Sequence, residues 1–386
     1  MTRTELSKAV FLAREIARDV LAPQAAAVDE EKRWPAEGVA ALRAALGGLV
    51  VPERFGGMGQ GLSAVAQVGE ATGRACASTS ICFGMHLVGS AVIAAKATDS
   101  HRERYLTPIA EGRHLTTLAL SEPGVGGEFW LPRTRMESSG ADGLRLTGAK
   151  SFVTNGGHAD SYVISTVATD PGAPPGEFSC AVVDADTPGL AWGAPWHGFG
   201  MRGNESRTLE LAGVEVDRRQ LLGEPGDEIW YVFSVVAPYF LMAMAGTYLG
   251  VAAAALDEAR AHVTARRHAH SGRALAAQPL VQHRLGVMWA RVERTRRLLH
   301  HAAATGEAGE PDALAALCSA KAEVAETAEA VVNDALTLTG GRGYSGDSAL
   351  HRLLRDARAA HVMSPITDVL RVWVGKSLLG EPLLGD

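Results

Sequence analysis

The sequence predicts an α+β fold in which a helical region, a β-region and a helical bundle follow one another along the chain. Residues 1–117 and 226–386 carry apolar side chains at helical spacing, whereas residues 118–225 contain short alternating strands bounded by turns. A chain of 386 residues is also long enough for more than one packed core. We therefore predict three domains with these three ranges.

The N-terminal range is expected to consist of amphipathic helices. The first begins near the N-terminus, with an apolar stripe that includes Leu6, Val10 and Ile16 and is interrupted by charges, which excludes a secretory signal. Further helical patterns cover residues 36–49, 62–74 and 81–95.

Charge and cysteine usage narrow the class of protein. The chain has 37 basic and 43 acidic residues, a net charge of −6 that argues against a nucleic-acid partner. Its 4 cysteines show neither paired spacing nor a metal-ligand pattern, so we predict a reduced, cytoplasmic protein without a metal site.

The remaining two ranges contain the middle strands and the long helices. Alternating patterns at residues 144–146, 161–167, 180–183 and 208–211 predict strands, and the Pro/Gly-rich residues 171–177 predict a hairpin loop. Residues 229–256 carry no charge, but Pro238 interrupts them and no basic cluster flanks them. We interpret this stretch as a buried helix of a bundle, without a membrane partner.

Five motifs in this order carry chemical information: SEPGVGG (121–127), GAKSFVTNGGHAD (148–160), GMRGNESRTLELAGVEV (200–216), TGGRGY (339–344) and RDARAAHVMSPITDVLR (355–371). The first is a glycine-rich loop whose backbone amides can approach a planar or anionic ligand closely. In the second, Phe152 and Thr154 lie two residues apart on a strand and so share one face.

These motifs resemble TEPGAGS, GxKxWITNGGxAD, GMRxSxS, GGNGF and RDAKxxxIYEGTxEIxR of the acyl-CoA dehydrogenase superfamily, over essentially the whole chain. The resemblance implies a helical N-terminal domain, a middle β-domain and a C-terminal four-helix bundle. It also implies FAD as cofactor, an acyl-CoA or acyl-carrier-protein substrate, and a homodimer or homotetramer. Electron-transfer flavoprotein or O2 is the implied electron acceptor.

The resemblance also assigns residues. It implies that Phe152 stacks on the flavin ring and that Thr154 hydrogen-bonds the flavin near its N5 atom. The positions implied for FAD are Leu118, Leu120, Ser121, Gly126, Gly127, Phe152, Thr154, His268, Thr337, Gly340, Gly341, Thr367 and Asp368. The positions implied for substrate are Gly127, Phe240, Leu241, Ser364 and Pro365.

Two groups of positions depart from the family pattern. Ser364 occupies the position of the catalytic glutamate, and the alternative glutamate–arginine positions are Phe240 and Leu241. The family segment RxxFG, which reaches the neighbouring subunit's FAD, aligns with residues 268–272 (HAHSG), and Thr337 replaces a glutamine.

The catalytic base therefore remains open in the sequence. On a continuous helix, His361, Ser364 and Asp368 would share one face, which makes them weak candidates. The favoured interpretation makes Ser364 the N-cap of a helix that begins at Pro365. Two further candidates are Tyr239 and Glu128.

Three functions stay possible at this point. The first is an FAD-dependent oxidoreductase acting on an acyl thioester, with a non-standard or absent α-proton base. The second is a flavin-dependent monooxygenase or oxidase on the same fold. The third is a catalytically silent subunit that partners an active paralogue.

Overall fold

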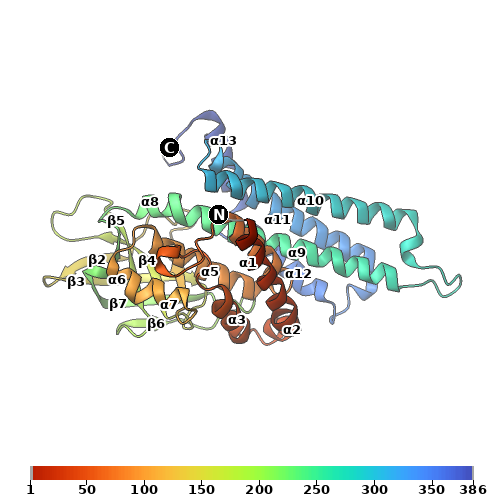
Figure 1. Ribbon diagram of the computed structural model, residues 1–386, viewed down its shortest axis with the longest axis horizontal. Coiled ribbons are helices and arrows are strands. Elements are labelled where there is room, and N and C mark those ends of the chain that lie inside the picture. Colours follow the sequence, from red (N-terminus) through yellow and green to blue (C-terminus); the bar gives the residue numbers. More distant parts are fainter. Residues whose placement is uncertain (1–2, 385–386) are drawn as a thin grey trace.

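The computed structural model describes residues 3–384 and arranges them as predicted, with helices, then a sheet, then a helical bundle (Figure 1). The N-terminal helices pack between the sheet at one end of the molecule and the bundle at the other. They are α1 (Arg3–Ile16), α2 (Ala22–Glu30), α3 (Ala36–Leu46), α4 (Leu62–Gly73), α5 (Ala77–Ala95), α6 (Asp99–His101) and α7 (Thr107–Ala110).

The middle region forms one sheet of 8 strands with the order β6-β7-β3-β2-β4-β5-β8, and β1 pairs with β4. The predicted strands all occur, and residues 169–177 form the loop between the antiparallel β4 and β5. The strands are β1 (Thr116–Ala119), β2 (Arg135–Ser139), β3 (Gly143–Val153), β4 (Ser161–Ala168), β5 (Phe178–Asp184), β6 (Leu190–Trp192), β7 (Arg207–Asp217) and β8 (Leu221–Leu222).

The long antiparallel pair β3–β7 is irregular at two places that shape the sheet. Gly213, with φ +68°, is skipped in the register between Ala212 and Val214. The second irregularity lies between Lys150 and Val153, and Phe152 there has φ +55°. The strand alternation is therefore broken where Phe152 leaves the sheet, and its ring is 67% exposed.

The C-terminal helices form the predicted bundle, in which α9, α10, α11 and α12 run alongside one another (Figure 1). A Cβ atom added at Gly246 would lie 2.3 Å from the Ala66 carbonyl oxygen, so α9 and α4 pack with their backbones in close approach. The helices are α8 (Glu228–Tyr231), α9 (Ala237–Ala265), α10 (Pro279–Ala308), α11 (Ala313–Thr339), α12 (Ala349–Val362) and α13 (Thr367–Leu379).

Among residues 3–384, two helical stretches have the length and apolar character of membrane spans, namely α5 and residues 228–265. The apolar window is buried completely in α5 and to 61% in residues 228–265. Both therefore serve as core helices, in agreement with the prediction for residues 229–256.

The link between α12 and α13 differs from the prediction. Ser364 is not an N-cap, because α13 begins at Thr367 with Ile366 at the cap position. A continuous helical face through His361, Ser364 and Asp368 is also wrong. Pro365 disfavours helical backbone at Ser364, and the Lys321 ammonium on α11 donates to the carbonyls of Met363 (3.2 Å) and Pro365 (2.8 Å) in this non-helical link.

Candidate active site

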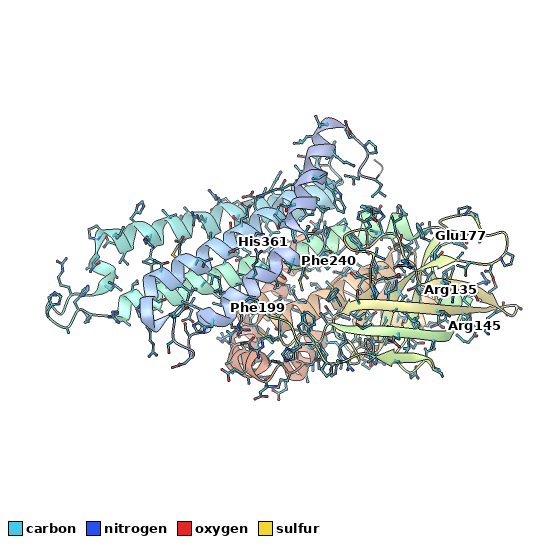
Figure 2. All side chains as sticks on the ribbon, turned by 180° about the vertical axis from the view of Figure 1, so that it is seen from behind. Arg135, Arg145, Glu177, Phe199, Phe240 and His361 are labelled. Atoms are coloured by element: carbon cyan, nitrogen blue, oxygen red, sulfur yellow. The ribbon has the colours of Figure 1, made fainter. Side chains whose placement is uncertain are left out.

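A cavity of about 440 Å³ lies where the sheet region meets α5, α9 and the α12–α13 link. Phe199 and Phe240, from opposite sides of this cavity, lie at the junction of sheet and bundle, whereas Arg135, Arg145 and Glu177 lie at the far end of the sheet (Figure 2). The cavity has two sides. We call one the β-wall, which is contributed by β1, β3 and the loops around them. We call the other the helical wall, which is contributed by α9, α12 and the link 363–366.

The β-wall contains five of the thirteen predicted flavin positions. Leu118, Leu120, Ser121, Phe152 and Thr154 all line the cavity. The Ser151 amide donates to the Ser121 carbonyl (2.8 Å), which joins the glycine-rich loop to β3. The exposed Phe152 ring meets the Trp196 ring edge-on at 6.2 Å.

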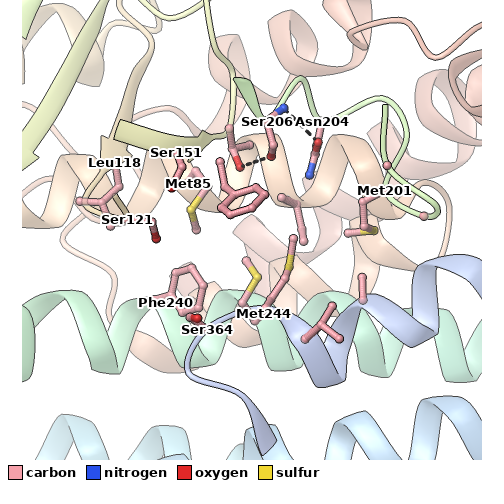
Figure 3. Close-up of a pocket in the computed structure, with 18 of the residues that line it drawn as sticks. Met85, Leu118, Ser121, Ser151, Met201, Asn204, Ser206, Phe240, Met244 and Ser364 are labelled. Carbon is pink, nitrogen blue, oxygen red and sulfur yellow. Dashed lines mark hydrogen bonds between the residues drawn. The ribbon is translucent and has the colours of Figure 1, made fainter. Parts of the chain in front are cut away.

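The segment 200–206, which begins the motif at residues 200–216, also forms part of the β-wall. Met201, Asn204 and Ser206 line the cavity (Figure 3). The hydroxyls of Thr154 and Ser206 lie 3.2 Å apart. The one available sequence signal was Asn204 itself, which stands where the family motif has serine.

The helical wall is apolar on α9, and its polar side chains are the Ser364 hydroxyl and two arginines of α12, Arg355 and Arg358. Phe240 and Met244 come from α9 and Ser364 from the link (Figure 3), and Pro365 of the link lines the cavity as well. Leu241 is fully buried in the core and is not among the residues that line the cavity. Ile81 and Met85 of α5, which sequence reasoning missed, line it as well, because nothing in a buried apolar helix distinguishes its cavity-facing residues.

No carboxylate or imidazole occurs among the described residues that line the cavity, and its only ionisable side chains are Arg355 and Arg358. Arg355 donates to Asp29 (2.8 Å) and to the Phe199 carbonyl (3.2 Å), and Arg358 lies 3.3 Å from Glu329. Both arginines are therefore already paired.

The weak base candidates lie outside this lining. His361 Nδ1 is 3.2 Å from the Thr367 hydroxyl, and its Nε2 is 2.9 Å from Glu329 but outside hydrogen-bond geometry. Asp368 and Glu128 are exposed, and Tyr239 packs against the core.

The other predicted cofactor positions are not brought to the cavity within one chain. Gly126 and Gly127 lie on an exposed turn, and Thr367 is buried beside His361. The α9–α10 loop, which contains His268, lies at the end of the bundle away from the sheet (Figure 1). Thr337, Gly340 and Gly341 are exposed, and within the described part of the chain the Thr337 hydroxyl donates only to the Asn333 carbonyl of its own helix.

A buried polar layer lies behind the β-wall. Lys150 is fully buried beside the cavity-lining Ser151 and donates to Glu122 (2.6 Å) and to the Ser165 carbonyl (2.6 Å). Burial raises the pKa of Glu122, but Lys150 and donors from Thr134 outweigh it, so this pKa lies below its ordinary value. Glu228 has no partner for either carboxyl oxygen among the described residues, and burial raises its pKa to about 8.

Comparison with known proteins identifies the family. Models of the acyl-CoA dehydrogenase N-terminal, middle and C-terminal domains match residues 5–113, 117–214 and 239–379. A cyclohex-1-ene-1-carbonyl-CoA dehydrogenase of Geobacter metallireducens is 31% identical over 95% of this chain and 96% of its own length. A probable acyl-CoA dehydrogenase of Mycobacterium tuberculosis is 29% identical over 95% of this chain and 93% of its own.

Solved structures agree on the fold. Butyryl-CoA dehydrogenase from Megasphaera elsdenii superposes with a TM-score of 0.91 at 24% identity, covering 98% of this chain and 99% of its own. The prolyl acyl carrier protein oxidase AnaB gives 0.86 at 22% identity, covering 98% and 100%. At these identities the likeness concerns the fold alone. Together with the three domain matches, it shows that the chain belongs to the acyl-CoA dehydrogenase family of flavin-dependent oxidoreductases.

Proposed function

We propose that the protein binds FAD along the β-wall and oxidises an acyl thioester whose acyl group enters the apolar part of the cavity. The relative from Geobacter metallireducens is named for a CoA-thioester substrate. The helical wall, with Phe240, Met244 and Pro365, provides apolar surface of the kind an acyl chain requires.

The β-wall residues fit a flavin. The Phe152 ring is exposed and presents a flat apolar surface, and the hydroxyls of Thr154 and Ser206 offer polar contacts. Asn204 adds a buried amide nitrogen with no acceptor among the described residues. When bound, FAD supplies the capacity to accept a hydride from the substrate.

The observation that carries the proposal is the absence of a carboxylate from the described lining of the cavity. Ser364 and Phe240, at the two positions where the family places its glutamate, both line the cavity. A serine hydroxyl has no acidity near neutral pH and needs a base of its own. We therefore propose that no carboxylate side chain removes the α-proton, and that ordinary α,β-dehydrogenation of saturated acyl-CoA is slow.

The same observation favours a second candidate, a flavin-dependent monooxygenase or oxidase. Oxygen-dependent chemistry at the flavin does not require a carboxylate at position 364. Both candidates place the flavin on the β-wall and differ in what reduces it.

We also propose that the protein assembles as a homodimer or homotetramer. Large apolar side chains on α10 and α13 remain exposed in the single chain, which is typical of subunit contacts. They include Leu280 (65%), Trp289 (58%), Leu378 (76%) and Leu379 (77%).

The test is the absorption spectrum of the purified protein, followed by anaerobic titration with saturated acyl-CoA and acyl-carrier-protein substrates. Bleaching of the flavin by an acyl thioester supports the first candidate. Reduction only by NAD(P)H or a reductase, followed by oxygen consumption, supports the second. A colourless protein that takes up no FAD would exclude both and leave the silent subunit.

A further inference from the structure

Asn204 is a buried residue whose backbone is fixed on both sides. It lies in the loop between β6 and β7 and is 0% exposed. Its amide N–H donates to the Met201 carbonyl (3.1 Å), and its carbonyl accepts from the Asn155 amide (3.1 Å). These two backbone hydrogen bonds therefore fix the position of the Asn204 Cα atom, from which the side chain extends, in the β-wall.

The oxygen of the Asn204 side-chain amide has a hydrogen-bond partner within the protein. Oδ1 of Asn204 accepts a hydrogen bond from the backbone N–H of Ser206 (3.2 Å). Since a backbone N–H requires an acceptor, this contact fixes which end of the amide is oxygen and which is nitrogen. Nδ2 is the opposite end of the same amide, and Asn204 is among the residues that line the cavity (Figure 3).

The other half has no protein partner. Nδ2 of Asn204 is buried and finds no acceptor among residues 3–384. Leaving a buried donor unpaired disfavours folding, so such groups ordinarily find partners. Gln220 shows the usual case: its Nε2 donates to Tyr105 and Val182 (both 3.0 Å), and its Oε1 accepts from the Asp217 amide (3.0 Å).

We propose that Asn204 Nδ2 donates a hydrogen bond to a carbonyl oxygen of the ligand in the cavity and so determines how that ligand is oriented. An uncharged amide donor matches an uncharged carbonyl oxygen, because a single amide N–H compensates a full negative charge poorly. Two ligands carry such a group, the flavin ring and the acyl thioester. In this respect the inference rests on the proposed function.

The test compares wild type with Asn204→Ala and Asn204→Asp. The first removes the donor, and the second keeps an acceptor for the Ser206 amide while replacing the donor with oxygen. Two dissociation constants are measured: FAD with the apoprotein, by quenching of flavin fluorescence, and the acyl-CoA that binds wild type most tightly with the FAD-loaded protein, by difference spectra. We expect one of them to rise about tenfold.

The dissociation constant that rises identifies the ligand that supplies the carbonyl. Weaker FAD binding assigns the contact to the flavin, and weaker acyl-CoA binding with FAD retained assigns it to the thioester. Unchanged constants in both variants overturn the inference. A wild-type protein that binds no FAD refutes the proposed function instead, so the two failures are distinguishable.

Gln220→Glu is the matched control, because it makes the same amide-to-acid change at a buried amide outside the cavity lining. We expect it to lower the melting temperature of the ligand-free protein and to leave both dissociation constants unchanged. A purely structural role of Asn204 would give the same result for Asn204→Asp, and would also overturn the inference.

Discussion

The two walls of the cavity differ in how far they keep the polar and acidic groups of the family motifs. The β-wall keeps the polar groups of the family motifs, including Ser121 and Thr154, and adds the amide of Asn204. The helical wall has lost every acidic group from its lining, with Phe240 and Ser364 where a glutamate is usual. The surface suited to a cofactor is thus retained, while the surface that would act on a saturated substrate is changed.

Buried carboxyl groups are nevertheless present nearby. Glu122 is held by Lys150 behind the β-wall, and Glu228 lies close enough to Lys150 for that charge to affect its pKa. The molecule can therefore accommodate acidic groups in its interior, and their absence from the cavity is specific to that surface.

The largest expected effect comes from returning a carboxylate to the helical wall. Ser364→Glu should accelerate anaerobic flavin reduction by a saturated acyl-CoA about a hundredfold or more, because a positioned general base contributes roughly 10²–10⁴. Burial in an apolar lining should raise the pKa of the new carboxyl, so the rate should increase with pH through that value. Stopped-flow absorbance measures the rate.

Ser364→Gln is the control, since it has the same size without a basic group. If both variants reduce the flavin equally fast, the missing carboxylate is not what limits the wild-type reaction. The proposed difference between the walls would then be wrong.

The second effect concerns Glu228 behind the β-wall. Its pKa of about 8 lies above the ordinary 4.5, so between these values the folded protein holds a proton that the unfolded chain releases. Stability should therefore fall as pH rises from about 4.5 to about 8. Glu228→Gln should remove this slope and raise the free energy of unfolding at pH 8 by on the order of 2 to 4 kcal/mol.

Urea unfolding at pH 5 and pH 8 measures this change. Glu215→Gln is the control, because Glu215 is an exposed carboxylate paired with Arg145 on the sheet surface. An unchanged pH slope in Glu228→Gln would show that this carboxyl is ionised in the folded protein.

The sequence predicts the β-wall better than the helical wall, for a physical reason. Phe152 and Thr154 belong to one short motif at the end of β3, so they lie close together although Phe152 leaves the strand alternation and Thr154 follows the strand. The position of Ser364 depends on Lys321, which is more than forty positions earlier in the chain and carries no local signal of that contact. The Ser364 N-cap prediction was wrong because α13 begins at Thr367, two residues beyond Pro365.

The third effect tests what holds the helical wall in place. Lys321→Met leaves the carbonyls of Met363 and Pro365 without their donor and should lower stability by about 2 kcal/mol. Burial lowers the pKa of Lys321 from the ordinary 10.5 to about 8. Between pH 8 and pH 10.5 this lysine is therefore protonated in the unfolded chain and largely deprotonated in the folded protein. Wild-type stability should rise with pH across that interval, and the variant should lose this slope.

Lys321→Arg is the conservative comparison, because it keeps donors near both carbonyls. Differential scanning calorimetry at pH 8 and pH 10 gives both the stability and its slope. A Lys321→Met protein as stable as wild type would mean that the link keeps its position without the ammonium.

The smallest expected effect tests the contribution of the β-wall residue Phe152 to FAD binding. Phe152→Ala should weaken FAD binding about tenfold, because stacking of a planar ring contributes roughly 1 to 1.5 kcal/mol. The ring is 67% exposed in the chain alone, so its loss should change the stability of the apoprotein by no more than about 0.5 kcal/mol. Phe11→Ala, at a ring that is 60% exposed on α1 outside the cavity lining, should change neither. Equal FAD binding by both variants would remove Phe152 from the flavin site and leave the β-wall defined by its polar groups alone.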